Sequence, residues 1–195
     1  MRKASLGPLG KVSRITLGGG GLGAIWGPTS ADEAVATVHA ALEAGVTLID
    51  TAPMYRDCEA VIGRAFEGRL PAGVRITTKH FLGAPPAALV AARLEASLTA
   101  SLAAIKLDRA DVFFLHSNIC EDDYVYAHGQ SRRDRFATPW SLYAGEVISV
   151  PRSAEGGRPH RRLGNHRRRR AGDDPEGAGS HPGARRRPDG GQSDG

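Results

Sequence analysis

The stretch that decides the fold is Val46-Thr-Leu-Ile-Asp-Thr-Ala-Pro-Met-Tyr55, a short β-rich run that ends in a carboxylate and leads to a tyrosine. Two later runs, residues 74–79 and 111–116, share this design, because β-branched or aromatic residues are followed by Lys79 and by His116. We therefore predict three buried strands, each ending in a side chain that is able to take part in chemistry.

Helical patterns separate these strands. Ser30 and Glu33 have the spacing of a capping box, which predicts the start of a helix, and Gly45 suits its C-terminal end. Further helices are predicted over residues 58–67 and after Pro85-Pro86, since proline fits the first helical turn. An amino-terminal hairpin and a strand at residues 15–17 precede them.

The resulting order β-α-β-α-β-α-β predicts a parallel sheet, because parallel neighbours need crossover connections. Two architectures share this order: the first half of a (β/α)8 TIM barrel and an open doubly wound sheet. The motifs have to distinguish between them.

The composition changes sharply along the chain. Residues 1–150 contain 15 basic and 15 acidic side chains, whereas residues 151–195 contain 11 arginines and 6 acids. The net charge of +5 therefore comes from the tail and does not indicate a nucleic-acid partner for the folded part. Because residues 151–195 include a single leucine as their only large apolar residue, we predict that residues 149–195 are a disordered Arg/Gly/Pro-rich tail.

Cysteine usage and hydropathy bear on the compartment. Cys58 and Cys120 form no CxxC pair, which favours a reduced, intracellular setting. We identify no signal peptide, and no apolar run approaches the roughly 20 residues of a membrane helix. These features predict a soluble cytoplasmic protein that has no membrane partner.

The polar residues at the strand ends suit one reaction in particular. On a barrel, Asp50, Tyr55, Lys79 and His116 would converge at the carboxyl ends of the strands. Reduction of a carbonyl by hydride needs a proton donor, and a phenol, with a pKa of about 10, is too weak an acid unless a neighbouring ammonium favours the phenolate. A carboxylate can hold that ammonium, and an imidazole can orient the carbonyl. Each residue alone has an ordinary structural explanation, but four in order at strand ends favour a catalytic site.

A dinucleotide-binding alternative rests on the glycine run. Gly18, Gly20 and Gly23 match G-x-G-x-x-G, and Asp50 ends the next strand where a ribose-binding acid would lie. That fingerprint requires a helix to begin within the glycines, so that its N-terminus meets the pyrophosphate. Because the helix cap comes only at Ser30, we expect the Rossmann alternative to fail.

The segments around the four residues resemble those of the aldo-keto reductases. The similar stretches are Asp50-Thr-Ala-Pro-Met-Tyr55, Thr-Thr-Lys79, Phe-Leu-His116, the run from Leu17 to Gly23 with Trp26-Gly27, and Glu59-Ala-Val-Ile-Gly63. The resemblance covers residues 1–148 and implies the first four to five β/α units of a TIM barrel.

The resemblance also implies an activity and the roles of its residues. The chain would be an NAD(P)H-dependent oxidoreductase that reduces an aldehyde or ketone to an alcohol, or the reverse, and NADPH would be the more usual cofactor. Tyr55 would be the general acid, Lys79 would favour its phenolate, Asp50 would hold Lys79, and His116 would orient the carbonyl. Gly20 and Asp50 would lie near the nicotinamide end of the cofactor.

The tail suggests a change of reading frame. Aldo-keto reductases have Ala-Trp-Gly-Ile-Thr-Gly-Val at their fifth strand, and codons for residues 162–169 can be chosen so that the second frame encodes those residues. We therefore predict that the tail is out of frame and that the truncated chain is poorly stable and weakly active or inactive. The alternatives are a noncatalytic half-barrel that associates with a partner, or a pseudogene product.

Overall fold

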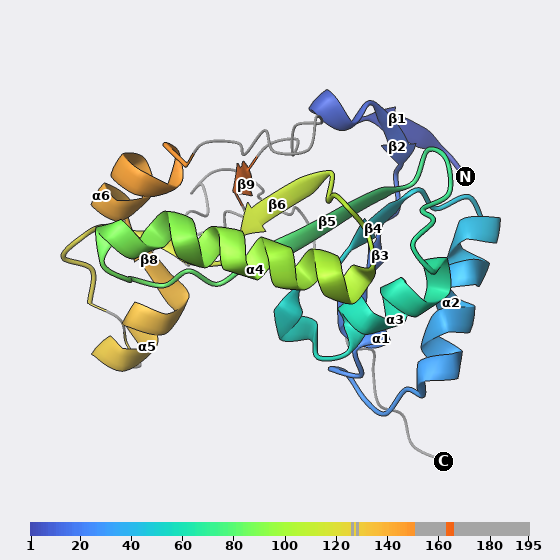
Figure 1. Cartoon of the computed structure of the whole chain (residues 1–195), viewed down its shortest axis with the longest axis horizontal. Helices are drawn as coiled ribbons and strands as arrows, with labels where there is room; N and C mark the ends of the chain where they lie inside the picture. The colour runs from blue at the N-terminus through green and yellow to red at the C-terminus, as the bar shows by residue number, and fades with distance from the viewer. Residues whose placement is uncertain (126, 128, 151–162, 166–195) are drawn as a thin grey trace, which may run out of the picture.

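The computed structural model describes residues 1–125, 127, 129–150 and 163–165 (Figure 1). Its centre is a five-stranded sheet in the order β3 (Leu17–Gly18), β4 (Leu48–Asp50), β5 (Arg75–His80), β6 (Val112–Leu115) and β9 (Leu163–Asn165), and every neighbouring pair is parallel. The strand order follows the chain without the reversal that a doubly wound sheet has. This is the order of a partial (β/α)8 barrel.

Helices connect these strands, and smaller elements lie at both ends of the sheet. The helical elements are η1 (Gly7–Leu9), α1 (Gly19–Leu22), α2 (Ala31–Glu43), η2 (Pro53–Tyr55), α3 (Cys58–Phe66), η3 (Ala87–Leu89), α4 (Val90–Ile105), α5 (Gln130–Phe136), α6 (Trp140–Leu142) and the π-helix η4 (Tyr143–Val147). The antiparallel hairpin is β1 (Lys3–Ser5) with β2 (Lys11–Ser13), and β7 (Asn118–Cys120) pairs in parallel with β8 (Ala137–Pro139).

Each central strand has one apolar face, which packs against the helices. The cores beneath α2, α3 and α4 include Ile49 from β4, Ile76 from β5 and Leu115 from β6. Because side chains alternate along a strand, the intervening residues Asp50, Thr77 and Lys79 point to the opposite face. On that face Leu9 of η1 and Val12 of β2 pack on Leu48.

Most predicted elements are present. Ser30 and Glu33 form the predicted capping box at the start of α2, with both reciprocal hydrogen bonds. The hairpin, α3 and α4 also appear where the sequence predicts them.

Two predictions differ from the structure. A short helix, α1, does begin within the glycine run at Gly19, although it ends at Leu22. The region after His116, for which we predicted no strand, contains β7, α5 and β8, and β7 pairs in parallel with β8. Figure 1 shows α5 and α6 on the side toward which the β6 arrow points.

The predicted disordered tail lies mostly outside the described residues. Its described segment, Leu163–Asn165, is the fifth parallel strand and pairs with Phe113, Phe114 and Leu115 of β6. The sequence did not predict this strand. The frame change itself stays a prediction.

The prediction that no stretch could span a membrane is too strict. Residues 87–105 are long and apolar enough to do so by length and composition. In the fold, α4 buries one side, which includes Val90, Leu94 and Ile105, against the rest of the molecule. The cytoplasmic location stays a prediction.

Candidate active site

An ion pair between Lys79 and Asp50 is the centre of the site. Lys79 Nζ donates to Asp50 Oδ2 at 2.6 Å and to the carbonyl oxygen of Thr51 at 3.0 Å. The lysine side chain is 5% exposed, whereas the aspartate side chain is 29% exposed. A buried ammonium needs such acceptors, because desolvation is otherwise very costly. The pair therefore fixes a positive charge at the end of β5.

Tyr55 lies against this charge. Lys79 Nζ is 3.3 Å from the phenol oxygen of Tyr55 and 4.7 Å from the centre of its ring. The tyrosine ends η2, a single turn that begins at Pro53, directly after β4 and Asp50. The positive charge is thus placed to stabilise the negative charge that forms when the phenol gives up its proton.

His116 completes the predicted group of four. It follows β6, and its backbone N–H donates to the carbonyl oxygen of His80 at 2.8 Å. Its ring centre lies 5.9 Å from that of Tyr55, with the two planes at 89°. The structure therefore brings together all four residues that the sequence singled out as catalytic.

Thr77 is a member of the site that the sequence analysis missed. Its hydroxyl donates to Asp50 Oδ1 at 2.6 Å, so each carboxylate oxygen accepts a bond from β5. The signal was present in the sequence, because Thr77 lies two residues before Lys79 and the period of a strand puts both on one face.

A second polar pair lies on the helix-covered side of β5. The Thr78 hydroxyl donates to Glu59 Oε1 at 2.7 Å, and Glu59 is only 5% exposed. Burial raises the pKa of this glutamic acid above its usual range. The contact ties α3 to the strand that carries Lys79.

The glycine run packs closely on the segment that carries the tyrosine. A Cβ at Gly23 would lie 1.7 Å from the carbonyl oxygen of Tyr55, and a Cβ at Gly19 would lie 2.4 Å from Cys58 Sγ. Side chains at these two positions would push the Tyr55 segment away from Lys79. The glycines that suggested a dinucleotide fingerprint therefore permit close approach to the segment that carries Tyr55.

A cavity of about 390 Å³ opens beside the ion pair. Asp50, Thr77 and Lys79 supply its polar side, and its apolar lining includes Leu6, Leu9, Leu48 and Phe114. Ligand sites typically combine an apolar wall with a few convergent polar groups. The cavity has this character.

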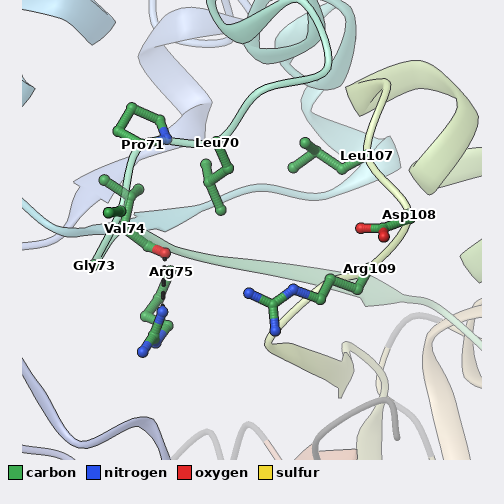
Figure 2. A pocket seen from close by; sticks show the side chains of 9 residues that line it. Leu70, Pro71, Gly73, Val74, Arg75, Leu107, Asp108 and Arg109 are labelled. Carbon is green, nitrogen blue, oxygen red and sulfur yellow. Dashed lines mark hydrogen bonds between the residues drawn. The ribbon is translucent and has the colours of Figure 1, made fainter. Parts of the chain in front are cut away.

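A smaller cavity of about 120 Å³ lies at the other end of the strands (Figure 2). Residues 70–75 and 107–109, which precede or begin β5 and β6, form its walls. Arg75 there donates to the carbonyl oxygen of Val74, drawn as a dashed line, and lies 3.6 Å from Asp111. None of the four predicted catalytic residues lines this cavity, and barrel active sites lie at the opposite, carboxyl end of the strands.

The arrangement can hold and release a proton next to the ion pair, although Asp50 and Lys79 line the large cavity and Tyr55 and His116 do not. A phenol next to a fixed ammonium can act as a general acid, and an imidazole beside it can bind the same carbonyl oxygen. Among the described residues, no group of three or more His, Cys, Asp or Glu side chains is placed to hold a metal ion.

Comparison with known proteins agrees with this geometry. A model of the aldo/keto reductase family matches residues 14–137. The chain is 32% identical over 124 residues to L-galactose dehydrogenase from Arabidopsis thaliana, covering 60% of the chain and 39% of that protein. It is 42% identical over 60 residues to the aldo-keto reductase YhdN from Bacillus subtilis, which is 29% of the chain and 18% of that protein.

Solved structures show the same fold. An aldo-keto reductase from Pseudomonas aeruginosa superposes with a TM-score of 0.54 at 22% identity, over 75% of this chain and 51% of that one. The chain thus spans about half the length of this structure and less of the two relatives above. Because the family model covers well over half of its residues, the chain belongs to the aldo/keto reductase family.

Proposed function

We propose that the site carries out NAD(P)H-dependent reduction of an aldehyde or ketone to an alcohol, and the reverse oxidation. The observation that carries this proposal is the position of Lys79 Nζ, 2.6 Å from Asp50 and 3.3 Å from the oxygen of Tyr55. Such a position serves a tyrosine that must exist transiently as phenolate.

Each residue has a separate task in this proposal. Tyr55 donates its proton to the carbonyl oxygen of the substrate. The nicotinamide, when bound, would supply the hydride for the carbonyl carbon. Lys79 stabilises the resulting phenolate, and Asp50 keeps Lys79 charged and in place. His116 orients the carbonyl oxygen toward the phenol, and in alcohol oxidation Tyr55 takes the proton back.

The residues present fit the nicotinamide end of the cofactor. The Asp50 carboxylate is partly exposed, and a carboxylate has about four acceptor positions, so it can accept from a ribose hydroxyl beyond its bonds to Thr77 and Lys79. Gly20 lies in the run beside Tyr55, although the indole of Trp26 lies over it, 2.7 Å from where a Cβ would be. We propose NADPH as the preferred cofactor, with Gly20 and Asp50 near its nicotinamide.

The proposed substrate is a small carbonyl compound or alcohol, and we expect weak activity from the 195-residue chain. The cavity beside Lys79 is bounded by β3, β4, β5, β6 and the amino-terminal segment. A complete eight-unit barrel typically needs about 250 residues, and most contacts with the rest of the cofactor would come from its later strands. Weak cofactor binding is the expected consequence.

A matched pair of tyrosine variants tests the reductase proposal. We expect the purified chain to oxidise NADPH in the presence of 4-nitrobenzaldehyde, a reactive carbonyl that makes small demands on the pocket. Tyr55→Phe should lower this rate by about 10²–10⁴-fold, the usual range for loss of a general acid. Tyr143→Phe, which removes a hydroxyl far along the chain in η4, should leave the rate unchanged. Equal rates in the two variants would contradict the proposal.

A noncatalytic role in assembly is the second candidate. The observation that favours it is the apolar part of the large cavity, where Leu6, Leu9, Leu48 and Phe114 line a face of the sheet that a closed barrel would cover. Co-purification with a complementary barrel half would support this role. Tyr55→Phe separates the two functions, because it should abolish reduction and leave the assembly intact.

A further inference from the structure

The orientation of the His116 ring depends on more than its own strand. The hydrogen bond from its N–H to the carbonyl oxygen of His80 holds the backbone, and contacts between rings act on the side chain itself. Phe81 stacks on the imidazole with ring centres 4.1 Å apart and planes at 22°. With one face covered by Phe81, the histidine ring stands nearly perpendicular to that of Tyr55.

Phe81 is held in turn by the elements β7, α5 and β8, which we call the β7–β8 segment. Phe136 from this segment meets Phe81 edge to face, with centres 5.3 Å apart and planes at 83°. Offset stacking and edge-to-face contact are the arrangements that aromatic rings prefer. The three rings of His116, Phe81 and Phe136 therefore form a continuous row that leads from the catalytic group into the segment.

Polar contacts dock the same segment on the turn that follows Phe81. The Thr138 hydroxyl donates to the carbonyl oxygen of Gly83 at 2.7 Å, and Ala84 N–H donates to the carbonyl oxygen of Asp134 at 2.8 Å. Thr138 is fully buried. Gly83 has a φ of +67°, and a Cβ there would lie 2.1 Å from the oxygen of Asp134, so only glycine permits this approach.

We propose that Phe81 is a positioning residue for His116 and that the β7–β8 segment keeps Phe81 in place. The effect of this positioning on catalysis rests on the reductase function proposed above, whereas the orientation of the His116 ring by Phe81 does not. A small displacement of a group that orients a carbonyl can cost about 10²-fold in rate. The β7–β8 segment therefore sets the reaction geometry although it contributes no residue to the group of four.

Nuclear magnetic resonance of the histidine rings tests the geometric part without any need for turnover. The chain has seven histidines, and His116→Gln identifies the His116 signals. Because a stacked aromatic ring shields the protons above it, the His116 ring protons should resonate upfield in the wild-type chain. Phe81→Leu should remove this shift and Phe81→Tyr should retain it. Phe66→Leu, which removes a ring from the core beneath α2 and α3, should leave the His116 signals unmoved.

A gentler variant guards against unfolding of Phe81→Leu. Thr138→Val removes the bond to Gly83 without changing any ring in the row. The His116 signals should move in the same direction as in Phe81→Leu, by a smaller amount. Unmoved His116 signals in both Phe81→Leu and Thr138→Val would overturn the proposal.

Kinetics test the catalytic part. Phe81→Leu should lower kcat for 4-nitrobenzaldehyde by about 10–100-fold, with KM within about twofold, and Phe81→Tyr should restore kcat. Wild-type kcat in Phe81→Leu would overturn the positioning role. No turnover in the wild-type chain would instead count against the reductase function, and the His116 signals would still decide whether Phe81 sets the ring.

Discussion

The two faces of the central sheet differ although they share the same strands. The face that α2, α3 and α4 cover is mostly apolar, with Ile49 and Ile76 completely buried, and its one polar contact described above joins Thr78 to Glu59. The other face carries Asp50 and Lys79 beside a cavity of about 390 Å³. Because neighbouring residues of a strand point to opposite faces of the sheet, one residue packs in the core and the next is available for chemistry.

This difference implies that neighbouring residues of one strand should respond differently to substitution. Residues on the helix-covered face should affect the free energy of unfolding, and residues on the cavity face should affect the reaction. The variants below test that separation.

The largest contrast is expected between Lys79→Met and Ile76→Ala in β5. Lys79→Met removes the charge next to Tyr55 and should lower the rate of reduction by about 10²–10⁴-fold. Ile76→Ala leaves a void in the core and should lower the free energy of unfolding by about 2–5 kcal/mol. Rate assays and urea unfolding of both variants would measure this. A larger stability loss in Lys79→Met than in Ile76→Ala would break the comparison.

A finer contrast is available in the adjacent threonines. Thr77→Val removes a donor from Asp50 and should lower kcat roughly tenfold, an estimate for a misplaced catalytic pair, with little effect on unfolding. Thr78→Val leaves the buried Glu59 without its threonine donor and should cost about 1–3 kcal/mol of stability, with kcat retained. If the two variants had the same effects, the faces would not be functionally distinct.

The helix-covered face should also show a pH dependence through Cys58. Burial raises the pKa of this thiol from 9.0 to about 11. The folded chain holds the thiol proton more tightly than the unfolded chain does. The contribution of the protonated thiol to the free energy of unfolding is therefore fully present below pH 9.0 and is lost as the pH rises toward about 11. The loss should be about 2–3 kcal/mol. Urea unfolding between these pH values should show the decline in wild type but not in Cys58→Ala.

The smallest effect is expected where neither face is involved. Ser30 caps α2 through the backbone N–H of Glu33, and both residues are exposed. Ser30→Ala should cost about 1 kcal/mol of stability and leave the rate unchanged. Thermal unfolding and the same rate assay would show this, and a clear loss of rate would mean that α2 affects the site.

The grouping of the four residues that we propose as catalytic was predictable from the sequence, because local rules place them. Asp50, Lys79 and His116 each end or follow a strand, and the carboxyl ends of parallel strands meet at one edge. Period-two alternation also predicts that Thr77 shares a face with Lys79, an inference that the sequence analysis did not draw. The capping box at Ser30 was predictable because its two hydrogen bonds join residues only three apart.

The features that the sequence did not predict depend on distant contacts. The stacking of Phe81 on His116 joins residues that follow two different strands, and the parallel pairing of β7 with β8 joins segments on either side of α5. No local period or turn signal indicates such contacts. The close packing of the glycine run could not be predicted for the same reason, because Gly19 and Gly23 contact Tyr55 and Cys58, more than 30 residues along the chain.

The most direct test of the account is isotope transfer from NADPH carrying deuterium at the reactive carbon of the nicotinamide. With 4-nitrobenzaldehyde and the purified 195-residue chain, mass spectrometry should find one deuterium on the carbinol carbon of the alcohol. The amount should fall by about 10²-fold or more in Tyr55→Phe, as expected for loss of the general acid. Absence of transfer in the wild-type chain, or equal transfer in Tyr55→Phe, would contradict the account.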